Sequence, residues 1–212
     1  MPAGIAPIVL AAGLCRRFGE AKLSTSFRGR PLLSHCLGAL AEAREAGLIE
    51  AGVVVHRPED LVSGTLAEEA GLRPIANPRP ATGMAHSLRL GLAALAADNG
   101  VDWAMIVLGD QPLLRLEVIE ALAAAARPPM DLVRPVYQTT PSAPGHPVLV
   151  HRRLWPLAAR LTGDQGFRTL AAWTPLRAGT IEVPGSNPDV DTPADLAALE
   201  AEGDAGVNVE AG

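Results

Sequence analysis

The chain has 212 residues and a net charge of −5, and its composition, 48% hydrophobic with only 3% aromatic, requires a core built from Ala, Leu, Val and Ile. It has no block of basic residues, few aromatic side chains to stack on bases, and two cysteines, which are too few for a disulfide framework. No stretch approaches the roughly 18 to 20 apolar residues of a membrane span, so we expect a soluble cytoplasmic protein without nucleic-acid or membrane partners.

Short apolar runs ended by Gly, Asp or Pro predict buried strands, and apolar residues spaced three or four apart predict helices. In chain order the predicted elements are strand 8–11, helix 32–45, strand 53–55, helix 58–70, strand 73–76, helix 84–97, strand 103–108, helix 116–126, strands 132–137 and 148–150, helices 154–161 and 166–173, strand 181–183 and a last helix from residue 192 or 193. This alternation indicates an α/β fold, a three-layer α/β/α sandwich with a mostly parallel, Rossmann-like sheet. We predict one domain over residues 1–202 and a flexible tail over residues 203–212.

The first predicted strand runs into a glycine-containing turn that carries cations. Ligands of such sheets bind at the carboxyl ends of the strands, where free backbone amides, Arg16, Arg17 and Lys22 could surround a triphosphate. Lys22 is the sole lysine among 18 Lys and Arg residues, and a compact ammonium suits phosphate better than a planar guanidinium does. The alternative interpretation is a mobile basic turn without a ligand.

Carboxylates follow two other predicted strands. Asp110 comes directly after the strand 103–108, and Asp189 and Asp191 follow the last strand. One or two protein carboxylates are the usual complement for Mg²⁺ that bridges phosphates. In an extended segment Asp189 and Asp191 point the same way, so either could be the second ligand. The competing interpretation is that these acids cap helices, and for Asp195, in the first turn of the last helix, capping is favoured.

A further turn supplies hydrogen-bond donors. Asn77-Pro78 and the segment 83–89, which leads into a predicted helix, could contact the edge of a base, although this signal is weak alone. The order of the motifs is more specific than any one of them. That order is Leu-Ala-Ala-Gly13, Arg17-Phe-Gly19 with Lys22, Asn77-Pro, Gly83-Met84 with Ser87-Leu-Arg89, Leu-Gly-Asp110-Gln-Pro, Gly-His146-Pro-Val, Gly163-Asp164-Gln-Gly and Asp189-Val-Asp191-Thr-Pro.

Over residues 5–200 this set resembles the molybdenum cofactor cytidylyltransferase family, a branch of the nucleotidyltransferases with a Rossmann-like nucleotidyltransferase fold. The resemblance implies transfer of CMP from CTP to the terminal phosphate of molybdenum-loaded molybdopterin, with release of pyrophosphate. It also implies Mg²⁺ as cofactor and a transient contact with a molybdenum hydroxylase that receives the product.

The family's residue roles carry over to matching positions in this chain. The residues implied to bind nucleotide are Leu10, Ala11, Ala12, Gly13, Arg17, Lys22, Asn77, Gly83, Ser87 and Asp110. Among these Arg17, Lys22 and Asp110 would be catalytic. Asp110 and Asp191 would hold Mg²⁺, and the residues implied to lie toward the pterin acceptor are His146, Gly163 and Asp164.

Four alternatives remain open from the sequence. A guanylyltransferase for the same cofactor is the nearest, although its family typically has Gly where this chain has Ala12, whose methyl group would crowd a larger base. The others are an NTP transferase that acts on another small phosphate acceptor, a non-catalytic carrier of the molybdenum cofactor, and a nicotinamide-dependent reductase. Against the reductase, no Gly-x-Gly-x-x-Gly fingerprint follows the first strand. The sequence leaves the oligomeric state undetermined.

Overall fold

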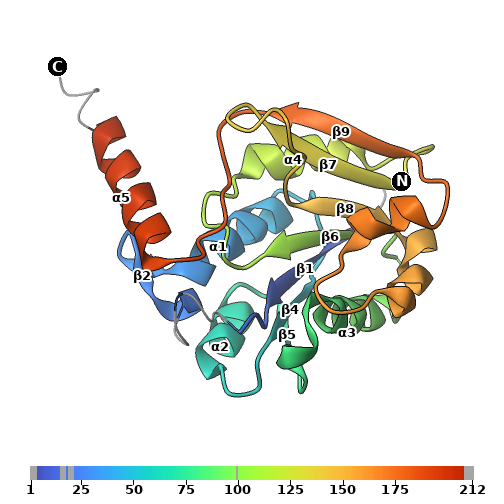
Figure 1. Cartoon of the computed structure of the whole chain (residues 1–212), viewed down its shortest axis with the longest axis horizontal. Coiled ribbons are helices and arrows are strands. Elements are labelled where there is room, and N and C mark those ends of the chain that lie inside the picture. Colours follow the sequence, from blue (N-terminus) through green and yellow to red (C-terminus); the bar gives the residue numbers. More distant parts are fainter. Residues whose placement is uncertain (1–3, 15–17, 19–21, 99, 208–212) are drawn as a thin grey trace.

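A seven-stranded, mostly parallel sheet forms the centre of the protein in a computed structural model that describes residues 4–14, 18, 22–98 and 100–207 (Figure 1). Across the sheet the strands are β5 (Arg73–Ala76), β4 (Val53–His56), β1 (Ile5–Ala11), β6 (Trp103–Leu108), β8 (Val148–His151), β7 (Leu132–Tyr137) and β9 (Ala178–Val183). Only β8 runs against its neighbours. β1 lies between β4 and β6, so the loop that follows it leaves from the middle of the sheet.

Helices cover both faces of the sheet, which confirms the predicted three-layer α/β/α sandwich. One face carries α1 (Leu32–Glu45), α2 (Leu61–Glu69) and α4 (Leu116–Ala125). The other carries α3 (Met84–Ala96) and two 3₁₀ helices, η3 (Arg152–Arg160) and η4 (Phe167–Ala172). The remaining elements are η1 (Lys22–Ser24), β2 (Ser26–Phe27), β3 (Arg30–Pro31), η2 (Pro80–Thr82) and α5 (Pro193–Val207).

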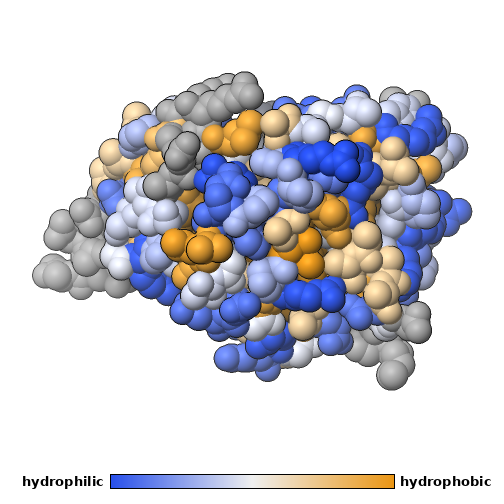
Figure 2. All heavy atoms as spheres, turned by 90° about the horizontal axis from the view of Figure 1, so that it is seen from below, coloured by the Kyte–Doolittle hydropathy of each residue, from blue (hydrophilic) through white to orange (hydrophobic). Residues whose placement is uncertain are grey.

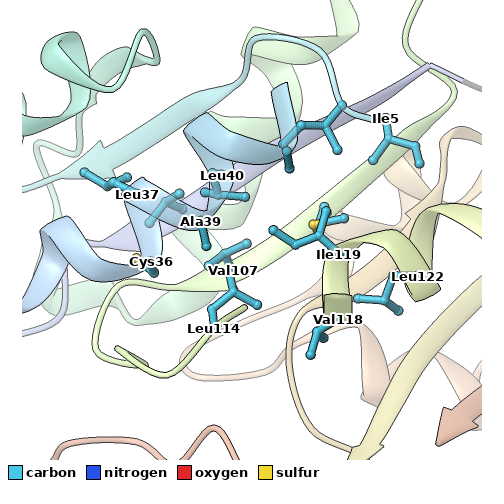
Figure 3. Close-up of a cluster of buried hydrophobic side chains, with 14 of the residues drawn as sticks. Ile5, Cys36, Leu37, Ala39, Leu40, Val107, Leu114, Val118, Ile119 and Leu122 are labelled. Carbon is cyan, nitrogen blue, oxygen red and sulfur yellow. The ribbon is translucent and has the colours of Figure 1, made fainter. Parts of the chain in front are cut away.

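The core is aliphatic, as the composition predicted. In the layer between α1, α4 and the sheet, side chains such as Leu37, Leu40, Val107, Ile119 and Leu122 are almost fully buried and converge (Figure 3). Each such aliphatic side chain contributes about 1.5–3 kcal/mol when it is removed from water. This layer holds the strands in register, and with them the loops at their carboxyl ends.

Several element boundaries and types differ from the predictions. Helix α2 begins at Leu61 rather than at residue 58, because Asp60 is its N-cap and accepts a hydrogen bond from the Ser63 amide (3.1 Å). The two segments predicted as helices 154–161 and 166–173 are 3₁₀ helices; η3 contains Pro156, which lacks an N–H to donate. Helix α5 continues to Val207, past residue 203 where the tail was predicted to begin.

A small hydrophobic cluster that includes a residue of the hairpin β2–β3 anchors helix α5 to the rest of the protein. The hairpin β2–β3 was absent from the predicted elements, because its strands have only two residues each. Its Phe27 packs with Leu32, Val190 and the α5 residues Leu196 and Leu199 in a small separate cluster. From this cluster α5 projects away from the body of the molecule (Figure 1).

Among the described residues, no helix is long and apolar enough to cross a membrane. The face shown in Figure 2, which includes the side of the molecule drawn lowest in Figure 1, intersperses hydrophilic and hydrophobic residues.

Candidate functional site

A cavity of about 810 Å³ lies at the carboxyl ends of β1 and β6. This is the edge at which ligands of open α/β sheets bind. The cavity is lined by Leu10, Ala11, Ala12, Gly13, Leu14, Lys22, Leu23, Pro80, Ala81, Gly83, Met84, Ser87, Leu108, Asp110, Asp164, Asp189 and Asp191. Most of the site residues named from the sequence are therefore gathered around one space.

Lys22 and two carboxylates form the charged end of the cavity. The Lys22 side chain is 5% exposed, and its ammonium Nζ lies 2.6 Å from Asp110 Oδ2 and 3.4 Å from Asp191 Oδ1. Asp110 and Asp191 are 88 and 169 positions away from Lys22 in the sequence, yet both contact its ammonium group. Asp191 is thus the acid that shares Lys22 with Asp110, and its role as the second metal ligand stays a prediction.

Asp189 also lines the cavity but has a different partner. Its Oδ1 accepts a hydrogen bond from Gln111 Nε2 (2.7 Å), and Gln111 Oε1 accepts one from Asn187 Nδ2 (3.3 Å). Burial raises the pKa of Asp189 above its ordinary value, and the negative charge of Asp110 raises it further. Asp110, Asp189 and Asp191 thus all line the cavity near Lys22, and two of them contact its ammonium group. Carboxylates held this close together favour a bound cation.

The opposite wall is built on the N-terminus of α3. Gly83 has φ +91°, and a Cβ built there would lie 2.3 Å from the backbone carbonyl carbon of Gly163, so the close approach of these two segments requires glycine. A Cβ at Gly13, which also lines the cavity, would meet no atom of the described residues within 4 Å, which leaves room beside the backbone on that side.

Asn77, which the resemblance implies to contact the nucleotide, lies behind the wall of the cavity. It is fully buried and does not line the cavity; its Nδ2 donates to Ser87 Oγ (2.9 Å) and its Oδ1 accepts from the Arg79 amide (2.8 Å). Ser87, which lines the cavity, is thereby oriented by Asn77. Asn77 is a positioning residue.

The turn at Gly163 and Asp164 is tied to the same helix. Asp164 Oδ1 accepts a hydrogen bond from the Met84 amide (3.1 Å), and the Gly163 carbonyl accepts one from the Ala85 amide (2.9 Å). Two of the amides that the N-terminus of α3 leaves without helical partners are satisfied in this way. Asp164 lines the cavity, whereas Gly163 does not.

His146 stands apart from the cavity lining. It precedes β8, and its carbonyl accepts a hydrogen bond from the Tyr137 hydroxyl (2.8 Å). Burial, followed by the charge of Arg134, lowers the pKa of His146 to about 4. The imidazole is therefore neutral at pH 7 in the folded protein.

Two groups of residues remain to be compared with the sequence predictions: those outside the described residues, and lining residues that the sequence did not indicate. Arg17 lies outside the described residues, as do Cys15 and Arg16. Sequence reasoning missed the wall formed by Pro80, Ala81 and Leu23. Pro80 and Ala81 belong to η2, and the only signal for it is the proline at its first position.

Comparison with known proteins shows which proteins the chain is similar to. Residues 7–178 match the family model described as MobA-like NTP transferase domain. The chain is 34% identical to the bifunctional protein GlmU of Streptomyces coelicolor over 144 residues, which are 66% of this chain but 29% of GlmU. It is 28% identical to the purine catabolism protein PucB of Bacillus subtilis over 205 residues, covering 88% of this chain and 91% of PucB.

Solved structures share the fold over nearly the whole chain. Rv0371c of Mycobacterium tuberculosis H37Rv is 25% identical, with a TM-score of 0.74 and coverage of 95% of this chain and 100% of that chain. Another structure of Rv0371c is a complex with manganese. 4-Diphosphocytidyl-2C-methyl-D-erythritol synthase of Anaerococcus prevotii is 17% identical, with a TM-score of 0.76 and coverage of 95% and 99%. At that identity the likeness shows the fold alone, which is the predicted nucleotidyltransferase fold.

Proposed function

The chain belongs to the family of MobA-like NTP transferases, and from this premise we propose that it transfers CMP from CTP to the terminal phosphate of molybdenum-loaded molybdopterin. The acceptor phosphate oxygen forms a bond to the α-phosphorus of CTP, the bond from that phosphorus to the bridging oxygen breaks, and pyrophosphate leaves with the electron pair. Nucleotidyl transfer is the activity of the family; CTP and molybdopterin are the specific part of the proposal. The ordered motifs, matched from Leu10 to Asp191, support that part.

The observation that carries the proposal is the convergence of Lys22, Asp110 and Asp191 at one end of a cavity large enough for a nucleotide. Ligand sites commonly have volumes of roughly 300–1,000 Å³. A triphosphate brings several negative charges, which Lys22 would neutralise. The glycine backbone of Gly13, open toward the cavity, supports close approach of the nucleotide.

The residues act by alignment and charge rather than by proton abstraction. A phosphate acceptor is already a nucleophile, so no strong general base is required. The cavity holds donor and acceptor in one geometry, which lowers the entropic part of the barrier. Lys22, and Arg17 by the resemblance, would stabilise the charge that develops on the departing pyrophosphate.

Mg²⁺ fits the side chains at this end of the cavity. Asp110 and Asp191 present hard oxygen donors to one cation, the ammonium of Lys22, and Mg²⁺ is usually held by one or two carboxylates together with phosphate oxygens and water. No group of three or more metal-ligating side chains is found among the described residues. When bound, the metal would supply charge neutralisation on the phosphates.

The test measures pyrophosphate release by the purified protein with Mg²⁺ and each of CTP, GTP, ATP and UTP, with and without molybdenum-loaded molybdopterin. Release that requires both CTP and this acceptor is the expected result. Release with GTP in place of CTP would instead establish the guanylyltransferase, and a different acceptor requirement would establish another NTP transferase. Absence of release with every nucleotide, together with tight binding of the cofactor, would favour the carrier.

The preference for CTP has its own structural test at Ala12, which lines the cavity and is almost completely buried. We expect Ala12→Gly to raise kcat/KM for GTP relative to CTP by about tenfold, since one methyl group is worth roughly 1–3 kcal/mol in a tight pocket. An unchanged ratio would mean that another residue selects the base.

A further inference from the structure

We propose that Arg134, Arg168 and His146 form an oxyanion-binding subsite beside the nucleotide cavity and hold an oxyanion group of the acceptor substrate. The inference rests on the proposed function, because the acceptor is taken to be anionic. It adds Arg134 and Arg168, which no sequence motif singled out, to the residues expected to act on the acceptor.

The position of Arg134 follows from the alternation of side chains along β7. Val133 packs in the core layer beneath α1 and α4, and Leu132 packs in the layer of α3, η3 and η4. Successive side chains of a strand point to opposite faces, so Arg134 lies on the same face as Leu132. This is the face on which Met84 and Ser87 line the cavity.

The loop before β8 brings His146 to the same edge of the sheet as the cavity. The antiparallel register pairs Val148 with Ile106, so the residues that precede Val148 lie toward Leu108, which lines the cavity. Arg168 lies in η4, four residues after Asp164, another lining residue. Arg134, Arg168 and His146 thus lie outside the cavity lining, on the side of η4 and the loop before β8.

The chain itself holds the guanidinium of Arg134 in place. Nε donates to the carbonyl of Gly145 (3.2 Å), and Nη2 donates to the carbonyl of Pro144. A guanidinium has five N–H donors, so these two bonds leave donors for a ligand. The Tyr137 hydroxyl fixes the next carbonyl, that of His146. The loop and Arg134 therefore form a rigid unit.

The charges in this region are unbalanced. Burial lowers the pKa of half-buried Arg134, and the positive charge of Arg168 lowers it further. Among the described residues, no ion pair joins either arginine to a carboxylate. A half-buried cation such as Arg134 is costly without a counter-charge, and a bound oxyanion would offset that cost. A neutral His146 can still donate one N–H to the oxyanion.

The test compares Arg134→Met and Arg168→Met with Arg73→Met. Arg73 is the matched control, because it lies on β5 at the far side of the sheet and also donates to a carbonyl, that of Ala94 (3.0 Å). We expect each of the first two variants to raise the KM for the acceptor about tenfold and to leave the KM for CTP unchanged. Arg73→Met should change neither constant.

Direct binding of inorganic phosphate, at constant ionic strength, separates this inference from the proposed function. Wild-type protein and Arg73→Met should bind it more tightly than Arg168→Met, whether or not any nucleotide is turned over. Equal binding by all three proteins would overturn the subsite, as would equal losses toward acceptor and CTP. If Arg134→Met fails to fold, Arg168→Met decides the matter, because Arg168 is exposed.

Two sources of oxyanion can then be distinguished with metal-free and molybdenum-loaded molybdopterin. An equal loss of affinity for both in Arg168→Met would identify the acceptor phosphate as the bound group. A loss confined to the loaded form would identify the oxygen atoms at molybdenum. Either result supports the subsite, and no loss for either acceptor contradicts it.

Discussion

Charged side chains are arranged differently at the carboxyl edge of the sheet, where the parallel strands end, and at the opposite edge, where they begin. At the carboxyl edge, Asp110 and Asp191 share Lys22, and the pKa of the neighbouring Asp189 is raised. At the opposite edge, Asp131 precedes β7 and is paired with Arg153 through both of its oxygens, and it also accepts a hydrogen bond from the Arg177 amide (2.9 Å).

Balance of charge distinguishes a structural cluster from a binding site. Hydrogen bonding to Arg153 lowers the pKa of Asp131, so the native structure favours the charged form of that carboxyl with its own groups. At the carboxyl edge, by contrast, burial and the charge of Asp110 raise the pKa of Asp189, so the fold disfavours the charge of that carboxylate. The following predictions test this contrast, from the largest expected effect to the smallest.

The largest effect is expected for Asp110→Asn, which keeps the shape of the side chain and removes its charge. We expect pyrophosphate release to fall by at least about 100-fold, the usual loss when one preorganised electrostatic group is removed. The melting temperature should change by only a few degrees, since Asp191 remains beside Lys22. A non-catalytic carrier would instead deliver its cofactor as well as the wild type does.

The matching change at the opposite edge, Asp131→Asn, should reduce stability and leave activity nearly unchanged. Asp131 is 4% exposed, and its loss leaves Arg153 without its carboxylate. We expect a loss of about 2 kcal/mol in unfolding free energy, measured by urea denaturation, because Arg153 is half-exposed and can regain water. The activity per folded molecule should stay within twofold of wild type; a large fall in kcat would contradict the structural role.

The two neighbouring acids, Asp189 and Asp191, should differ in their effect on metal. Asp191→Asn should raise the Mg²⁺ concentration for half-maximal activity about tenfold, the effect expected when a ligand is replaced by a weaker one. Asp189→Asn should raise it less, because Asp189 Oδ1 is directed to Gln111. The reverse order in a Mg²⁺ titration would make Asp189 the second ligand.

The smallest predicted effect is a difference in pH dependence between the edges. The folded-state pKa of Asp189 is raised, so its ionised form opposes folding; Asp189→Asn should stabilise the protein at pH 7, by less than about 1 kcal/mol after screening, and have no such effect near pH 3.

Because the pKa of Asp131 is lowered, its stabilising effect is present above its unfolded value and is lost as the pH falls through the folded value. The deficit of Asp131→Asn should therefore shrink in acid. Thermal melts of both variants from pH 3 to 7 measure the two trends, and parallel curves would contradict them.

Much of the fold could be read from local patterns. Four elements have the predicted bounds, namely α1, β5, β6 and β7, because a glycine or a polar, turn-forming residue follows each of them within two positions. Periodicity could not distinguish the 3₁₀ helices η3 and η4 from α-helices, since both bury side chains three or four apart. It could not find β2 and β3 either, because two residues make no pattern.

The site was predictable to a similar degree. The positions that follow β1 and β6 line the cavity because parallel strands end at one edge. Asn77 was placed in direct contact with the nucleotide, yet its bond to Ser87 depends on the way in which the loop folds back on α3. Arg134 belongs to none of the sequence motifs. Its proposed role depends on the loop before β8 and on η4, which come near it only in the folded chain.

The sequence by itself determined the α/β/α class, the aliphatic core and the presence of Lys22, Asp110 and Asp191 near strand ends, because these follow from spacing along the chain. Only the tertiary structure decided which charges meet. Asp191 rather than Asp189 pairs with Lys22, and Asp131 is neutralised by Arg153, because electrostatic energy depends on separations of a few ångströms between residues far apart in sequence.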